Sequence, residues 1–248
     1  MPPAELPAGT YTNVVGNQTI AWGLIAGAQA AGLPLFYASY PITPASDVLH
    51  ELSRHKNFGV KTFQAEDEIA AVGVALGASF VGHLGVTGTS GPGVALKSET
   101  ISLALMAELP LIIVDVQRGG PSTGLPTKVE QSDLLAAIYG QPGDAPHVVL
   151  APSSIEECFH SMITARRIAE TFRMLVIVLS DANLATGVAP FARPSMDPNW
   201  HSPPPDLSPI PEGLKPYDWD PKTGLSRRFI PGAPGGMHTL TGLAHDER

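Results

Sequence analysis

The sequence contains one cysteine, Cys158, among its 248 residues. A single cysteine excludes a disulfide within the chain, and it excludes a thiolate-ligated metal or iron–sulfur cluster built from this chain alone. Basic residues are also in the minority, with 15 lysines and arginines against 23 acidic residues and a net charge of −8. This balance argues against nucleic acid or an anionic membrane surface as the main partner, because both attract basic patches.

The sequence also lacks long apolar runs and a recognisable leader. No run approaches the roughly 18 apolar residues that a membrane span needs. The N-terminal stretch MPPAELPAGTY has neither the basic nor the apolar region of a signal peptide. We therefore expect a soluble, cytoplasmic protein that does not bind membranes.

Proline, in contrast, is abundant and unevenly distributed. Eleven of the 25 prolines lie in the last 58 residues, where apolar clusters are few. Such a segment is typical of irregular structure. We predict one domain over residues 1–190, followed by an extended Pro-rich arm over residues 191–248 that wraps a partner or links to a C-terminal domain.

Apolar strand patterns alternate with helical patterns in the first 190 residues. The strand-like runs are LPLFYASY, VKTFQ, GVTGTS, LPLIIVDVQ and RMLVIVLSD. This alternation predicts an α/β fold with a mostly parallel sheet and helices on both faces. Ligands in such sheets bind at the carboxyl ends of the strands. The rule selects four loops, at residues 40–46, 64–68, 89–93 and 117–127.

Four helices have start signals in the sequence. We expect Asn17 to cap a helix that ends at Gly32, and Thr43 to cap a second helix with Pro44 at its first position. A third helix is expected to run unbroken over residues 93–108. A fourth is expected to open with a capping box formed by Ser153 and Glu156.

Three of the loops allow an ordinary structural interpretation beside a functional one. In YPITPAS the helix start is either a plain cap or an anion site, since free amides and the helix dipole attract a carboxylate or phosphate. TSGPGVALKS fails as a phosphate loop, because Val94 stands where a Walker motif requires lysine. A tight glycine turn is the simpler interpretation there. In QRGGPSTGLPT, Arg118 matches a carboxylate well, with an exposed salt bridge as the alternative.

The stretch TFQAEDEIAAVGVALGAS places three acids at the start of a helix. Acids in a first turn are favoured by the helix dipole. On a helix that starts near Asp67, however, Glu68 shares a face with Val72, Ala75 and Ser79. A carboxyl on that buried face is costly without a specific partner. Glu68 is therefore the acid that we expect to turn inward.

Taken together, YPITPAS, QAEDEIAAVGVALGAS, TSGPG and QRGGPSTGLPT resemble the alpha subunit of 2-oxoacid:ferredoxin oxidoreductases, especially the 2-oxoglutarate type. The similarity extends from about Gly16 to Asp181. The resemblance implies the pyrimidine-binding domain of a thiamine diphosphate enzyme. It also implies oxidative decarboxylation of a 2-oxoacid to its acyl-CoA, with electrons passed to ferredoxin.

The resemblance also implies roles for individual residues. Glu68 matches the catalytic glutamate that hydrogen-bonds the aminopyrimidine ring of the cofactor. Thr43 and Arg118 match residues associated with the substrate carboxylate, and Thr127 matches a position near the far end of the substrate. The remaining cofactor-binding positions implied are Tyr40, Pro41, Ser90 and Gly91.

The motif for diphosphate and magnesium is missing from this sequence. In the family, Mg²⁺ and a [4Fe-4S] cluster belong to the beta subunit, so the resemblance implies a hetero-oligomer with no metal held by this chain. Pyruvate- or branched-chain-specific activity remains open, as does a non-catalytic assembly subunit. A transketolase-like reaction is disfavoured by YPITP and QRGGPSTG together.

Overall fold

A six-stranded parallel sheet forms the centre of the protein, whose computed structural model describes residues 5–246. Its strand order is β3-β2-β4-β5-β7-β6, and each neighbouring pair is parallel. The strands are β2 (Leu35–Ser39), β3 (Lys61–Gln64), β4 (Leu84–Thr89), β5 (Leu111–Gln117), β6 (Val148–Leu150) and β7 (Leu175–Asp181). The predicted α/β class and parallel sheet are confirmed.

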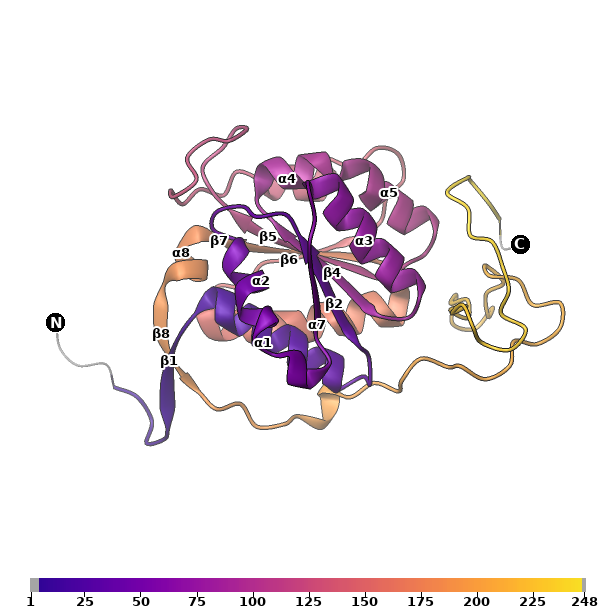
Figure 1. Ribbon diagram of the computed structural model, residues 1–248, viewed down its shortest axis with the longest axis horizontal. Coiled ribbons are helices and arrows are strands. Elements are labelled where there is room, and N and C mark those ends of the chain that lie inside the picture. Colours follow the sequence, from indigo (N-terminus) through magenta and orange to yellow (C-terminus); the bar gives the residue numbers. More distant parts are fainter. Residues whose placement is uncertain (1–4, 247–248) are drawn as a thin grey trace.

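Helices cover both faces of this sheet (Figure 1). One face carries α3 (Glu68–Phe80), α4 (Gly91–Leu96), α5 (Ser98–Met106) and α6 (Leu134–Tyr139). The other carries α1 (Gly16–Gln29), α2 (Ser46–Ser53), α7 (Ile155–Phe172) and α8 (Ala182–Thr186). The two central strands β4 and β5 are buried along their whole length, which explains their uninterrupted runs of apolar and small residues.

A separate two-stranded antiparallel ribbon lies beside α1. It pairs β1 (Tyr11–Val15) with β8 (Val188–Ala192), so the predicted boundary at residue 190 falls inside a strand. From residue 193 to residue 246 the only helix or strand is one 3₁₀ turn, Pro198–Trp200. Elsewhere in the chain, another 3₁₀ turn, Lys56–Phe58, follows α2.

The Pro-rich segment packs along the edge of the domain at which the helices end. Ser202 donates its backbone N–H to Ala30 at the end of α1, and Arg228 pairs with Glu170 near the end of α7 at 2.5 Å. Arg228 also donates to the carbonyl of Ser79 near the end of α3. Because α3 and α7 run antiparallel to the strands they connect, this is the edge opposite the strands' carboxyl ends.

Two predicted helix starts were wrong. Asn17 lies inside α1 rather than capping it, because its buried side chain donates to the carbonyl of Pro44 at 2.8 Å. Thr43 does not cap α2, which begins at Ser46 after a cis peptide between Thr43 and Pro44. The Ser46 hydroxyl closes that turn through hydrogen bonds with the backbone of Ile42.

Two further helix details were wrong as well. The predicted helix over residues 93–108 is two helices that meet at Lys97, whose side chain turns inward to the start of α3. The cap of α7 is Ser154, which accepts from Glu157 N–H at 3.1 Å. The carboxylate of Glu157 binds Ser153 instead, so Glu156 takes no part in the cap.

Candidate active site

Four loops meet at the carboxyl edge of the sheet. In register, the last residue of β2, Ser39, lies beside Gln64 on one neighbour and Gly88 on the other. On the next strand pair, Thr89 lies beside Asp115. Since all these strands are parallel, the segments after β2, β3, β4 and β5 leave the sheet at the same edge. The loops selected from the sequence are therefore neighbours in space.

Glu68 is the first residue of α3 and is 9% exposed. The preceding residue, Asp67, caps the helix by accepting from the Ala70 N–H at 2.6 Å. Val72, Ala75 and Ser79 are buried on the same helix, which confirms the predicted inward face. Within residues 5–246, no N–H or hydroxyl group donates to the Glu68 carboxylate. This carboxylate is thus nearly buried and free to bond with a group that the chain does not supply.

A glycine holds open the space beside Glu68. A Cβ built on Gly93 would lie 2.9 Å from the Cγ of Glu68, and it would collide with the Thr89 hydroxyl. Any side chain at this position would force Glu68 to move. Gly93 of TSGPG therefore allows the turn after β4 to approach the start of α3 closely.

Lys97 lies beneath the same helix start and is fully buried. Its Nζ donates to the Glu68 carbonyl at 2.8 Å. Burial lowers the pKa of Lys97 to about 8, and the nearby carboxylates of Glu68 and Asp67 oppose that shift. The sequence pattern places Lys97 inside one continuous helix over residues 93–108 and does not predict this contact.

Replacing Lys97 with methionine is expected to change how stability depends on pH. Because the folded pKa is depressed from 10.5, this lysine contributes stability that is present above pH 10.5 and lost as the pH falls through about 8. From pH 8 to about 9.5, the wild type should therefore gain about 2 kcal/mol of unfolding free energy over Lys97→Met.

Urea unfolding at several pH values measures this difference. Lys56→Met, which changes an exposed lysine, is the matched control and should show no such trend. A stability difference between wild type and Lys97→Met that is constant from pH 7 to 9.5 would contradict the assignment.

Two side chains from different loops, Arg118 and Ser90, converge on the backbone carbonyl of Thr43 in a third loop. The Arg118 guanidinium, 6% exposed, donates from Nη1 to the Thr43 carbonyl at 2.6 Å. The Ser90 hydroxyl donates to the same oxygen at 3.4 Å. Arg118 Nε has no hydrogen-bond partner in residues 5–246. A buried guanidinium with an unmet N–H is suited to bind an oxyanion.

Other predicted residues lie on the same edge without joining this cluster. Tyr40 is 38% exposed, and Pro41 and Thr127 are exposed too. None of the hydrogen bonds within residues 5–246 links Tyr40 or Thr127 to Glu68 or Arg118. Thr127 is carried by the loop after β5, which folds back on itself through an antiparallel bridge between Gly119 and Leu125.

A cavity of about 680 Å³ adjoins this cluster. Its lining includes Gly91, Arg118, Glu130, Ser132 and Asp133, so it contains side chains of both charge signs. The carboxyl groups in this wall come from Glu130 and Asp133, which the sequence analysis did not single out.

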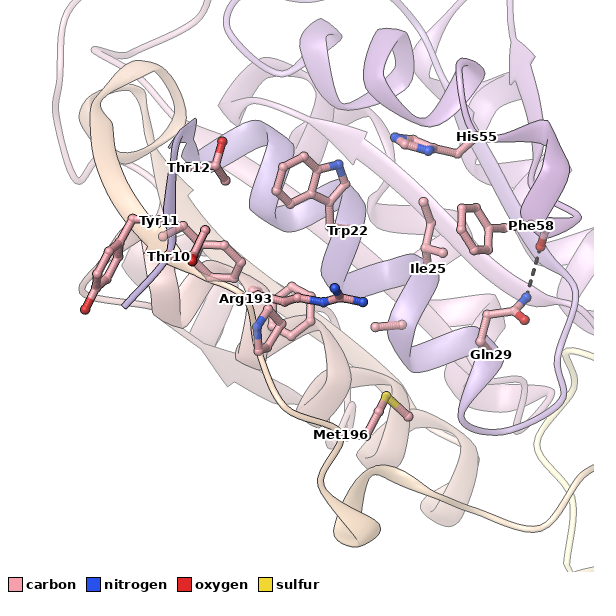
Figure 2. Close-up of a pocket in the computed structure, with 14 residues that line it drawn as sticks. Thr10, Tyr11, Thr12, Trp22, Ile25, Gln29, His55, Phe58, Arg193 and Met196 are labelled. Atoms are coloured by element: carbon pink, nitrogen blue, oxygen red, sulfur yellow. Dashed lines mark hydrogen bonds between the residues drawn. The ribbon is translucent and has the colours of Figure 1, made fainter. Parts of the chain in front are cut away.

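A second cavity, of about 700 Å³, lies where α1 faces β1 and the segment after β8. Figure 2 shows Trp22, Ile25 and Gln29 projecting from α1, with Arg193 and Met196 on the facing segment. Its lining is mainly apolar and includes no residue with a predicted catalytic role. We therefore assign the candidate active site to the carboxyl edge.

Residues 5–246 contain no cluster of three or more histidine, cysteine, aspartate or glutamate side chains that could hold a metal ion. No helix in the same range has the length and apolar character required to cross a bilayer.

Comparison with known proteins gives consistent matches. Residues 27–203 match the family described as "Pyruvate flavodoxin/ferredoxin oxidoreductase, thiamine diP-bdg". The chain is 54% identical over 251 aligned positions to 2-oxoglutarate oxidoreductase subunit KorA of Mycobacterium tuberculosis, covering 98% of this chain and 37% of that protein. It is 42% identical over 183 positions to ketoisovalerate oxidoreductase subunit VorB of Methanothermobacter thermautotrophicus, covering 73% of this chain and 50% of that one.

A solved structure is similar over nearly the whole chain. It is the 2-oxoglutarate:ferredoxin oxidoreductase from Magnetococcus marinus with 2-oxoglutarate, coenzyme A and succinyl-CoA bound. The TM-score is 0.87 at 40% identity, covering 96% of this chain and 41% of that one. The chain thus spans between about a third and a half of the length of these three proteins.

Proposed function

The chain belongs to the pyruvate flavodoxin/ferredoxin oxidoreductase family through its thiamine diphosphate-binding part, and from this we propose that it acts as the alpha subunit, or the N-terminal part of one, of a 2-oxoglutarate:ferredoxin oxidoreductase. The reaction is oxidative decarboxylation of a 2-oxoacid to its acyl-CoA, with electrons passed to ferredoxin. A beta subunit completes the enzyme, and it supplies Mg²⁺ and a [4Fe-4S] cluster.

The nearly buried, donor-free carboxylate of Glu68 is the observation that carries this proposal. It fits the pyrimidine half of thiamine diphosphate, which presents a ring nitrogen able to share a proton with a carboxyl group. Gly93 keeps the adjacent space clear. The residues expected to hold the pyrimidine side are Glu68, Tyr40, Pro41, Ser90 and Gly91.

When bound, thiamine diphosphate supplies the electron sink for decarboxylation, and the chain supplies geometry and charge. Glu68 holds or releases a proton at its carboxylate next to the pyrimidine ring. Arg118 and Thr43 bind the substrate carboxylate, next to the Thr43 carbonyl that already accepts from Arg118. Thr127, which is exposed in the loop after β5, contacts the far end of the substrate.

The choice of 2-oxoacid has a second candidate. Similarity to a ketoisovalerate oxidoreductase subunit favours a branched-chain substrate as the alternative to 2-oxoglutarate. The higher identity to KorA over nearly the whole chain favours 2-oxoglutarate.

The direct test uses the chain co-expressed with its beta subunit. With coenzyme A present, we expect 2-oxoglutarate to drive viologen reduction with a kcat/KM at least about tenfold above that for pyruvate or branched-chain 2-oxoacids, since one well-placed polar contact accounts for such a ratio. Preference for a branched-chain acid would overturn the substrate assignment. An assembled complex that turns over none of these acids would overturn the catalytic role and favour an assembly subunit.

A further inference from the structure

Asp115 is an acid inside the most buried strand of the protein. It lies in β5, in which every residue is buried, and its own exposure is 0%. Neither of its carboxyl oxygens accepts a hydrogen bond from an N–H or hydroxyl group within residues 5–246. An ionised carboxylate in such surroundings is strongly disfavoured. The group must therefore be neutral, or it must share a proton with a neighbour.

That neighbour is Asp133, whose carboxyl group lies against Gly91, two residues after the strand partner of Asp115, and interacts with the Asp115 carboxyl group. One oxygen of Asp133, Oδ1, accepts from the Ser132 hydroxyl at 3.1 Å, and the other, Oδ2, has no donor in residues 5–246. Two carboxylate groups are both acceptors, so they can hydrogen-bond only when one of them carries a proton. A single proton between the two acids pairs one oxygen of Asp115 with one oxygen of Asp133.

Asp133 occupies the cap position of α6 without capping the helix with its side chain. Asp67 and Asp181, at equivalent positions of α3 and α8, both accept backbone N–H groups. The Asp133 carboxylate instead lies against Gly91, where an added Cβ would be 2.9 Å from its Oδ2. Its backbone N–H donates to the Gln117 side chain at 3.3 Å, at the opposite end of the same loop.

The electrostatics place the proton on Asp115. Burial and the neighbouring Asp133 raise the pKa of Asp115 well above its ordinary value. Asp133 is less buried, and burial raises its pKa above the ordinary value. Ser132, Asp115 and Arg118 oppose that rise, and Glu130 adds to it. The charged groups that face the pair are thus Arg118 and Glu130, and Asp133 carries the negative charge.

We propose that Asp115 and Asp133 share one proton, and that this pair is a positioning element which fixes the loop of residues 118–133 over the candidate active site. Loss of the proton would place two negative charges side by side. Asp133 would then move away from Gly91, and the C-terminal end of the loop would no longer be held in place. The added charge would also attract the Arg118 guanidinium away from an anionic substrate, a consequence that rests on the proposed function.

The decisive variant is Asp115→Asn, because an amide keeps the shape and the donor of the protonated acid but cannot ionise. Asp115→Leu removes the hydrogen-bond donor of the protonated acid and keeps a side chain of similar size. Asp144→Asn, in an exposed loop, is the matched control for the same chemical change.

Tryptic cleavage after Lys128 reports on the loop in the full chain without any need for activity. Lys128 is exposed, and its carbonyl accepts from Gly119 N–H at 2.9 Å while the loop is closed. Between pH 7 and 9, cleavage of the wild type relative to Asp115→Asn should rise at least about threefold, because proteolysis follows the open population. Asp144→Asn should follow the wild type. A ratio that stays constant would overturn the proposal, even if Asp115→Leu fails to fold.

Thermal unfolding provides a second measurement that does not depend on function. A raised folded pKa gives stability that is present below the unfolded pKa and is lost as pH rises toward the folded value. Asp115→Asn should therefore gain in melting temperature relative to wild type as the pH rises from 5 to 8. A difference that is independent of pH would count against a shared proton.

In the assembled enzyme, the KM for 2-oxoglutarate should rise on the alkaline side in the wild type and not in Asp115→Asn. Asp115→Leu should raise this KM more than it lowers kcat. If no variant turns over 2-oxoacids while cleavage after Lys128 behaves as expected, the proposed function fails and the acid pair stands. If the KM for 2-oxoglutarate rises equally with pH in wild type and Asp115→Asn, the proposed effect of the acid pair on Arg118 is wrong.

Discussion

Glu68→Gln is expected to lower turnover of the assembled enzyme by about two to four orders of magnitude, the usual contribution of a positioned proton-transfer group. Glutamine has the same shape and can still hydrogen-bond a ring nitrogen, but it cannot exchange a proton with it. The buried position, 9% exposed, leaves little room for water to take over. The measurement is 2-oxoacid-dependent viologen reduction under saturating cofactor.

Glu66→Gln is the matched control for this prediction. Glu66 is exposed, precedes α3 by two residues and changes the net charge by the same amount. It should retain near-normal activity, because its carboxylate lies outside the buried face. Thermal unfolding and copurification with the beta subunit establish that both variants fold and assemble. Equal activity in Glu68→Gln and Glu66→Gln would contradict the role of Glu68.

The inward face of Glu68 could be predicted because helical periodicity is local. Residues four and seven positions further along are apolar, so the face follows from the sequence alone. The convergence of the four loops was predictable for a similar reason, since parallel strands share one carboxyl edge. Both inferences depend on repeat patterns rather than on any particular tertiary contact.

The break at Lys97 could not be predicted in this way. The pattern of VALKSETISLAL suits a single amphipathic helix, and lysine is a good helix former. The break depends on a hydrogen bond to the Glu68 carbonyl, a group of another element 29 residues away in sequence. The start of α2 was missed for a comparable reason, because the Ser46 hydroxyl competes for the turn that Thr43 was expected to cap.

The contact between Asp115 and Asp133 could be predicted only in part. An aspartate in LIIVDVQ is visible as a polar residue in a buried strand, and buried acids tend to mark functional sites. The sequence does not reveal its partner, because Asp133 follows a long loop and resembles an ordinary helix cap. Only the three-dimensional arrangement shows that its side chain does not cap α6.

Arg118→Ala is expected to raise the KM for the 2-oxoacid by about 10- to 150-fold, which corresponds to the roughly 1.5–3 kcal/mol of a charged hydrogen bond. The KM for coenzyme A should stay within about twofold, because the proposed interaction of Arg118 is with the 2-oxoacid carboxylate alone. Initial rates with each substrate varied in turn measure both values. Arg54→Ala, which removes an exposed arginine of the α2 region, should leave both constants unchanged.

Arg118→Lys distinguishes charge from geometry at this position. Lysine keeps the positive charge but lacks the planar fork that can hold the Thr43 carbonyl and a carboxylate together. If the guanidinium binds the substrate through both its charge and its planar geometry, the KM of the lysine variant should lie between those of wild type and the alanine variant. If Arg118 only braces Thr43 against the loop, both variants should lose stability and affect the two substrates alike. Such a uniform change would refute direct carboxylate binding.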